Sequence, residues 1–191
     1  MDLFTGKEPH DISLEIALAW TENYEVKNPG QINGLYFGGA AISTILSQTG
    51  CVGNRLYYAL NDVGVKELIA VGVKASQNDM YEGLLAVNTV NGQQEDISLE
   101  AASARTKNYR DNNPDQIIGH YFGGDAISAI LAQTGCVGIR IKYALNDEGI
   151  KQLIVVGVDA FHKDMINGIL AERSINCPPT CGIENPLNSD I

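Results

Sequence analysis

Two cysteines with the same surroundings are the first candidates for chemistry in this chain. Cys51 lies in "QTGCVGNRLYYALND" (Gln48–Asp62), and Cys136 lies in "QTGCVGIRIKYALND" (Gln133–Asp147). A catalytic cysteine needs a neighbouring base and an environment that stabilises the thiolate. Both cysteines sit in a "G-C-V-G" corner between an expected helix and an expected strand. A small apolar thiol suits such a corner, so we expect both to be buried, reduced and unreactive.

The histidines argue against a duplicated Cys–His site. The chain contains two similar copies of one segment, 85 residues apart. When these copies are aligned, each histidine stands opposite another residue type: His10 opposite Glu95, His120 opposite Leu35, and His162 opposite Gln77. No histidine is therefore duplicated together with the cysteine. A doubled catalytic pair is excluded, whereas a single site in one copy stays open.

The remaining cysteines, Cys177 and Cys181, lie in the tail sequence "CPPTCG". They are weak candidates for half a metal site, because a structural zinc needs four ligands and no second pair has suitable spacing. We therefore expect no metal and no cofactor. The favoured interpretation is an extended tail stiffened by proline, with a local disulfide or docking onto a neighbouring subunit as alternatives.

Four polar and aromatic residues are the best candidates for binding a small ligand. Arg55 and Arg140 are cations on otherwise apolar hairpins, and a guanidinium can hold a carboxylate through two hydrogen bonds. Tyr58 and Tyr143 follow on the same strands. No catalytic residue can be assigned, since no nucleophile elbow and no convincing pair of carboxylates is present.

The elements that must position these residues occur twice. A shift of 85 residues aligns Asp11–Met80 with Asp96–Met165 without a gap, and roughly two positions in three are identical. This is a tandem duplication, with a period too long for a solenoid repeat. The expected domains are an N-terminal lead over 1–10, repeats over 11–87 and 96–172, a linker over 88–95 and a tail over 173–191.

Each copy begins with two expected helices. Ser13 and Ser98 are good N-caps for the first helix, which ends before Asn28-Pro29 or Asn113-Pro114, because proline disfavours helix in the preceding residue. The sequence "YFGG" then reads as a turn before a second, shorter helix. That helix ends at Gly50 or Gly135, where a C-cap glycine belongs.

Two expected strands follow the helices. The first alternates apolar and polar residues from Val137 to Leu145, as in a half-buried strand. A hairpin loop with glycine in the left-handed position follows, at Asn61–Gly64 and Asn146–Gly149. The returning strand Leu153–Val158 is apolar on both faces and requires cover on both sides. Third, short strands remain an open alternative at "MYEGLLAV" and "MINGILAE".

Composition limits the class of function. The chain has 191 residues and a formal net charge of -10, which argues against a nucleic-acid partner and against an anionic membrane surface. No apolar run approaches the roughly 20 residues of a membrane span, and the N-terminus has no secretory pattern. We expect a cytoplasmic protein, in which the four cysteines are thiols.

The sequence also resembles a family of proteins. The pattern "YFGGDAISAILAQTGCVGIRIKYALNDEGIKQLIVVGVD", the preceding "ISLEAASARTKNYR" and the tail "CPPTCG" look like an uncharacterised family of small bacterial proteins. The resemblance covers both repeats and the tail. It implies a bacterial, cytoplasmic origin and transfers no functional residue.

These observations predict an α+β fold built from two α-α-β-β-(β) units. We expect their hairpins to join into one antiparallel sheet with helices packed on one face. The favoured function is a structural or interaction protein that self-associates as a homo-oligomer or a filament. Its interface would be an aliphatic strip including Leu153, Val155 and Val156. The alternative is a small-ligand-binding protein or enzyme with its pocket between the repeats.

Overall fold

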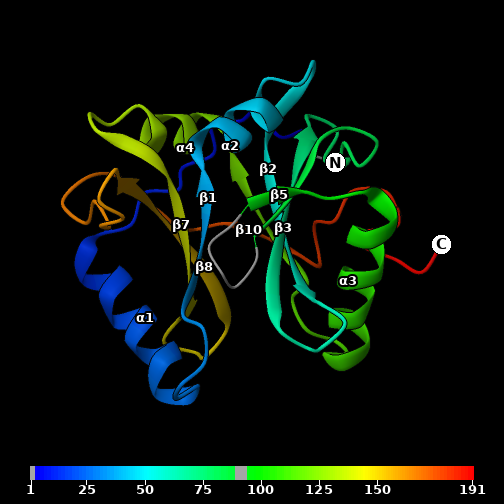
Figure 1. Ribbon diagram of the computed structural model, residues 1–191, viewed down its shortest axis with the longest axis horizontal. Coiled ribbons are helices and arrows are strands. Elements are labelled where there is room, and N and C mark those ends of the chain that lie inside the picture. Colours follow the sequence, from blue (N-terminus) through cyan, green and yellow to red (C-terminus); the bar gives the residue numbers. More distant parts are fainter. Residues whose placement is uncertain (1–2, 89–93) are drawn as a thin grey trace.

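A computed structural model describes residues 3–88 and 94–191 of the chain (Figure 1). The described part contains helices and antiparallel sheets, so the expected α+β class is confirmed. The elements, in chain order, are α1 (Leu14–Lys27), β1 (Gly34–Gly38), α2 (Gly39–Leu46), β2 (Cys51–Leu60), β3 (Lys66–Lys74), β4 (Leu85–Asn88), β5 (Gln94–Asp96), α3 (Leu99–Asn112), β6 (Gly119–Gly123), α4 (Gly124–Leu131), β7 (Cys136–Leu145), β8 (Lys151–Asp159), β9 (Leu170–Ala171) and β10 (Ile175–Cys177).

The strands form two sheets rather than the single joined sheet expected from the sequence. One sheet has the order β1-β7-β8-β9, and the other has the order β10-β6-β2-β3-β4-β5. Figure 1 shows the two sheets facing each other. Both hairpins carry apolar side chains on both faces, and stacking buries one face of each against the other. Joining them edge to edge would have left those faces uncovered.

The two halves of the chain exchange a strand. Strand β1 of the first half pairs with β7 of the second, with Leu35 opposite Ile141. Strand β6 of the second half pairs with β2 of the first, with His120 opposite Leu56. Both pairs of partners are related by the same shift of 85 residues. Each "YFGG" segment therefore ends a strand, with its last glycine, Gly39 or Gly124, beginning a helix, and the expectation of a turn there was wrong.

Glycine permits the backbones to approach closely where the exchanged strands end. A Cβ atom placed on Gly53 would collide with the carbonyl oxygen of Phe122, and one on Gly138 would collide with that of Phe37. Larger residues would force the exchanged strands apart at these points. The glycines thus fix how tightly β6 lies on β2 and β1 on β7.

The inter-sheet core contains large apolar side chains from both halves. Helices α2 and α4 lie across one end of the two sheets (Figure 1) and insert buried isoleucines into this core. The members that are fully or almost fully buried include Phe37, Ile42, Ile45, Leu56, Leu68, Phe122, Ile127, Ile130, Ile139, Ile141, Leu153 and Val155.

Helices α1 and α3 cover the outer faces of the two sheets, one on each side (Figure 1). Ala17 of α1 packs with Ile154 and Val156, and Ala102 of α3 lies in the cluster with Ile69 and Val71. The expectation of helices on one face was therefore wrong. With two sheets stacked face to face, each sheet has an outer face of its own, and a helix covers each.

The local capping signals agree with the helix bounds. The Ser13 hydroxyl accepts a hydrogen bond from the Ile16 amide, and the Ser98 hydroxyl accepts one from the Ala101 amide. Helix α1 ends at Lys27, directly before Asn28-Pro29, and α3 ends at Asn112. In the hairpin loops Gly64 and Gly149 both have φ of 78°, the left-handed conformation expected of glycine there.

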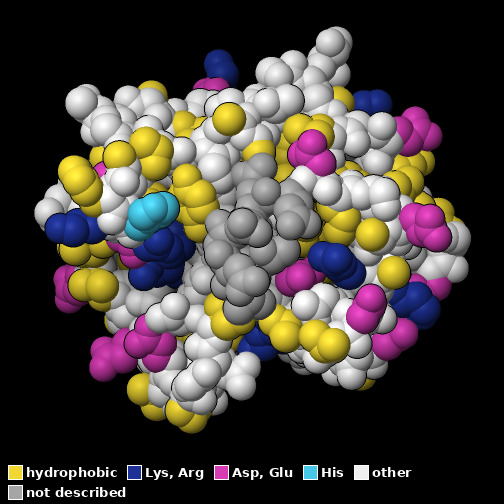
Figure 2. All heavy atoms as spheres, viewed as in Figure 1, with side chains coloured by type: hydrophobic (Ala, Val, Ile, Leu, Met, Phe, Trp, Pro, Cys, Tyr) yellow, Lys and Arg dark blue, Asp and Glu magenta, His cyan; other side chains and the backbone are white. Residues whose placement is uncertain are grey.

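The strip expected to form a subunit interface is buried inside the chain. Leu153 and Val155 are completely buried in the core between the sheets, and Val156 is 2% exposed beneath α1. The two-faced strand β8 thus obtains both covers from its own chain, which corrects the assignment of these residues to an interface. On the face shown in Figure 2, hydrophobic side chains appear in small groups between polar ones.

The cysteines are in two different states. Cys177 and Cys181 form a disulfide, which corrects the expectation of four thiols and leaves neither sulfur available as a metal ligand. Cys51 and Cys136 are free and only half-buried, rather than fully buried as expected. Their thiols donate to the carbonyl oxygens of Gly53 and Gly138, at 3.2 and 3.1 Å.

The third strand of each repeat is present. Strand β4 continues the larger sheet and β9 continues the smaller one, each as a neighbour of the returning strand of its own repeat. The linker expected over 88–95 lies mainly on residues 89–93, which are outside the described residues. The described ends of the expected linker belong to strands, since Asn88 ends β4 and Gln94 begins β5.

The strand exchange predicts that neither repeat folds alone. Expressed separately, residues 1–92 and 93–191 would each leave the exchanged strand without its partner and the core without the opposing sheet. Circular dichroism and thermal unfolding should show no cooperative transition for either fragment, whereas a mixture of the two should regain one. A cooperative transition in an isolated fragment would show that the exchange is not required for folding.

Candidate functional site

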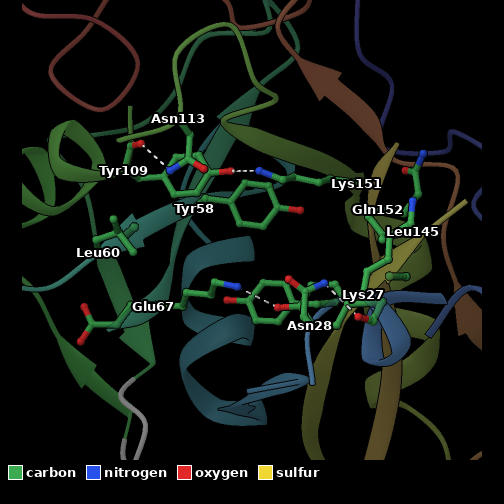
Figure 3. A pocket seen from close by; sticks show the side chains of 15 residues that line it. Lys27, Asn28, Tyr58, Leu60, Glu67, Tyr109, Asn113, Leu145, Lys151 and Gln152 are labelled. Carbon is green, nitrogen blue, oxygen red and sulfur yellow. Dashed lines mark hydrogen bonds between the residues drawn. The ribbon is translucent and has the colours of Figure 1, made fainter. Parts of the chain in front are cut away.

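A cavity of about 350 Å³ opens between the sheets (Figure 3). The strand and helix ends that line it lie at the end of the molecule opposite α2 and α4 (Figure 1). Its walls come from the ends of β2 and β7, the starts of β3 and β8, and the C-terminal ends of α1 and α3. Corresponding positions of the two repeats meet there, so that most lining residues occur in pairs. Three such pairs are Tyr24 with Tyr109, Tyr58 with Tyr143, and Lys66 with Lys151.

Four tyrosine rings form a continuous stack along the cavity. The ring centroids of Tyr24 and Tyr143 are 5.4 Å apart, those of Tyr143 and Tyr58 are 6.0 Å apart, and those of Tyr58 and Tyr109 are 5.1 Å apart. The two outer rings come from helices α1 and α3 and the two inner rings from strands β7 and β2, and successive rings belong to alternate halves of the chain. The stack therefore joins the two sheets and gives the cavity flat aromatic walls.

Two lysines reach into the cavity from opposite sheets. The Lys66 ammonium donates to the Tyr24 hydroxyl at 3.0 Å, and the Lys151 ammonium donates to the Tyr109 hydroxyl at 2.8 Å (Figure 3). Each ammonium also lies over the ring of the tyrosine that it contacts, and Lys151 lies 5.9 Å from the ring centroid of Tyr58 as well. The tyrosine hydroxyls and rings are thus the described contacts of the two ammonium groups.

Neither lysine has a carboxylate partner among the side chains that the structure describes. The carboxylate of Glu67, next along β3, pairs instead with Arg105 at 2.8 Å. Burial lowers the pKa of Lys151, and the neighbouring charge of Lys66 lowers it further. Lys27 lines the cavity as well, and the lysines outnumber the one carboxylate of the described lining, that of Glu67, so the potential in the cavity is positive.

The buried tyrosine hydroxyls are proton donors at neutral pH. Burial raises the pKa values of Tyr58 and Tyr143 well above the ordinary value of 10.0, and the neighbouring tyrosines raise them further. Burial likewise raises the pKa of Tyr109. The phenols therefore remain neutral and can donate hydrogen bonds to an acceptor, but they do not serve as phenolate bases.

The two halves differ in the surroundings of the equivalent hydroxyls of Tyr58 and Tyr143. The Tyr58 hydroxyl lies 3.0 Å from Nε2 of His120, whose Nδ1 lies 2.7 Å from the Ser174 hydroxyl. Burial lowers the pKa of His120 to about 3, so the imidazole is neutral. The Tyr143 hydroxyl is also buried, but it has no hydrogen-bond partner among the described residues.

The structure brings only half of the expected ligand residues together. Tyr58 and Tyr143 line the cavity, while Arg55 and Arg140 lie elsewhere, which corrects their assignment to a common pocket. Three positions separate each arginine from its tyrosine, and an odd separation places two residues on opposite faces of a strand.

The arginines serve other contacts. Arg55 is completely buried, forms an ion pair with Asp79 and donates to the carbonyl oxygens of Thr180 and Cys181, at 3.2 and 3.0 Å. It therefore holds the disulfide-containing tail against the larger sheet. Arg140 forms the equivalent ion pair with Asp164 but remains partly exposed.

Sequence reasoning missed the lysines and two of the tyrosines. Tyr24 and Tyr109 lie in the expected first helices and Lys66 and Lys151 follow the hairpin loops, places in which tyrosine and lysine are ordinary. Their only signal was their recurrence at the same place in both copies. Recurrence alone does not reveal that two copies of a position meet in one cavity.

Comparison with known proteins adds no assignment. The chain matches no family model, and no similar curated protein or solved structure was found, so the resemblance to a bacterial family is untested. Within the described residues, no group of three side chains is arranged to hold a metal ion, and no helix is long and apolar enough to cross a bilayer.

The buried neutral histidine predicts a pH dependence of stability. The pKa of His120 falls from 6.5 to about 3 on folding, so below about pH 6.5 the unfolded chain binds a proton that the folded chain does not. The free energy of unfolding should fall as the pH decreases, with a contribution of about 1.4 kcal/mol per pH unit from His120. His120→Leu should make this dependence less steep in urea unfolding between pH 4.5 and 7.5.

The exposed His162 provides a matched control, because the other repeat has glutamine at the equivalent position. His162→Gln should leave the slope unchanged. A residual slope is expected in His120→Leu, since burial also lowers the pKa of His10. Equal slopes in the wild type and His120→Leu would show that His120 is not held neutral by the fold.

Proposed function

We propose that this protein binds a small anionic ligand in the cavity between its two sheets. The observation that carries the proposal is the pair of half-buried lysines, Lys66 and Lys151, which have no carboxylate partner among the described side chains. The chain contains 23 acidic residues and only 13 lysines and arginines, so carboxylates are abundant elsewhere. Two unpaired cations in one cavity of so acidic a protein favour an anion as the missing partner.

Electrostatics supports this choice. Holding two like charges close together in a partly desolvated cavity costs free energy, and an anion bound between them would offset that cost. Each ammonium uses one of its three protons for a tyrosine hydroxyl and keeps others for a ligand. A carboxylate or a phosphate ester has the required charge and acceptors.

The shape of the cavity indicates the rest of the ligand. A volume of about 350 Å³ lies within the range of small-molecule sites. The inner rings, Tyr143 and Tyr58, are stacked on both faces, so a planar or aromatic body would pack against the outer rings of Tyr24 and Tyr109 or the ring edges. The ligand class that fits best is a compact anion with a planar apolar part.

We propose ligand binding in place of self-association as the main function. Self-association rested on an exposed aliphatic strip, and Leu153, Val155 and Val156 are packed inside the chain. An enzymatic role has no specific support, since the described lining contains no cysteine, serine or histidine and its one carboxylate, that of Glu67, is paired with Arg105. Ligand binding is the function that uses the cavity residues as they are arranged.

The proposal predicts that the two lysines determine affinity for anions. Lys66→Met and Lys151→Met should each weaken binding about tenfold or more, because each removes a charge-assisted hydrogen bond. Isothermal titration calorimetry with benzoate and phenyl phosphate would measure the loss, with benzamide as a neutral probe of similar shape. Affinity should also fall as the salt concentration rises.

Lys163→Met is the matched control, because Lys163 is an exposed lysine outside the cavity and its loss changes the net charge equally. This variant should bind the anions like the wild type. Binding of benzoate no stronger than that of benzamide, or full affinity in the Lys66→Met/Lys151→Met double variant, would refute the proposed function.

A further inference from the structure

Most residues that line the cavity occur in both halves, but the hydrogen-bond partner of the Tyr58 hydroxyl, His120, occurs only once. His120 of β6 lies opposite Leu56 of β2, and Leu35 of β1 lies opposite Ile141 of β7 in the same register. Leu35 therefore occupies, relative to Tyr143, the place that His120 occupies relative to Tyr58. A leucine side chain offers no hydrogen bond, which explains why only the Tyr58 hydroxyl finds a partner there.

Tyr143 is the exception among the four tyrosines that line the cavity. The Tyr24 hydroxyl contacts Lys66 and the carbonyl oxygen of Ile32, and the Tyr109 hydroxyl contacts Lys151 and the carbonyl oxygen of Ile117. The Tyr143 hydroxyl alone of the four has no partner among the described residues, although Tyr143 is only 4% exposed. Other buried polar atoms without a partner, such as those of Asn54 and Asn88, lie outside the cavity lining.

A buried hydroxyl without a partner destabilises a folded protein, and such groups are uncommon in native structures. Tyr143 lines the cavity, and a ligand there can supply the missing hydrogen bond if its binding uncovers the hydroxyl, of which less than 1 Å² is exposed. The opposite orientation, which would place the same ligand atom at Tyr58, meets a hydroxyl already engaged with His120. The near-symmetric cavity therefore has one free donor and one preferred orientation for its occupant.

We propose that the ligand is an anion with a second oxygen, a hydroxyl or carbonyl at the far side of its planar body, which hydrogen-bonds to Tyr143. The lysines would hold the anionic group and Tyr143 the remote oxygen. The substrate class is thus an aromatic hydroxy acid or oxo acid rather than a simple aromatic acid. This inference rests on the proposed function of the cavity.

Benzoate and 4-hydroxybenzoate are suitable probes, because they differ only in an oxygen opposite the carboxylate. The wild type should bind 4-hydroxybenzoate about tenfold more tightly than benzoate, since the added hydroxyl satisfies a buried polar group. Tyr143→Phe should bind the two probes equally, because the preference requires the hydroxyl. Isothermal titration calorimetry of both proteins with both probes measures the change.

Stability without ligand provides a second readout. Tyr143→Phe removes a hydroxyl that has no partner, so its midpoint of thermal unfolding should equal or exceed that of the wild type. Tyr58→Phe removes the hydroxyl that pairs with His120 and should lower the midpoint. A lower midpoint for Tyr143→Phe would indicate an internal partner for Tyr143 and would overturn the inference.

Leu35→His tests the same idea, because it would give the Tyr143 hydroxyl a histidine partner equivalent to the one that His120 provides for Tyr58. It should reduce the preference for 4-hydroxybenzoate, because the Tyr143 hydroxyl would then be engaged as that of Tyr58 is. Tyr36→Phe is the control, since the Tyr36 hydroxyl contacts the Val137 carbonyl oxygen away from the cavity, and this variant should keep the preference.

The outcomes separate this inference from the proposed function. If both probes bind with equal affinity and the lysine variants abolish that binding, the anion site stands and the role of Tyr143 is refuted. If neither probe binds more tightly than benzamide, the anion site itself is refuted. A preference for 4-hydroxybenzoate that survives in Tyr143→Phe would place the remote oxygen elsewhere and would also overturn the inference.

Discussion

The reciprocal exchange of β1 and β6 is the constraint on which the rest of this structure depends. Each sheet takes a strand from the other half of the chain, β1 at the edge of the smaller sheet and β6 inside the larger one, so the two halves must lie face to face. The close approach at Gly53 and Gly138 keeps the exchanged strands on their partners. The inter-sheet core, the tyrosine stack and the paired lysines all follow from that arrangement, because every one of them draws side chains from both halves.

Nearly identical segments have acquired different surroundings within this arrangement. Arg55 and Arg140 form equivalent ion pairs, yet the C-terminal tail buries the first completely and leaves the second partly exposed. A buried ion pair is stable only when its remaining donors are satisfied, and the tail carbonyls at Thr180 and Cys181 provide that for Arg55. The tail therefore makes the two halves unequal without any change in their core.

The cavity combines repetition with a local difference. The lysines and tyrosines recur in both halves and give it a positive potential between aromatic walls. The replacement of a leucine by a histidine, at Leu35 and His120, changes which hydroxyl is free. Such a difference makes one binding orientation more favourable than the other in a site that duplication made almost symmetric. A ligand with two different ends can then bind in a single orientation.

The sequence by itself determined the local structure: the serine caps, the helix ends before proline, the hairpin glycines and the duplication itself. It also showed that β8 needs cover on both faces, since its apolar residues are consecutive. Only the tertiary structure decided what provides that cover, because a strand's pattern records that a face is buried and not what buries it. For the same reason, Tyr58 and Tyr143 could be suspected separately, while their meeting between Lys66 and Lys151 required contacts 85 residues apart in the chain.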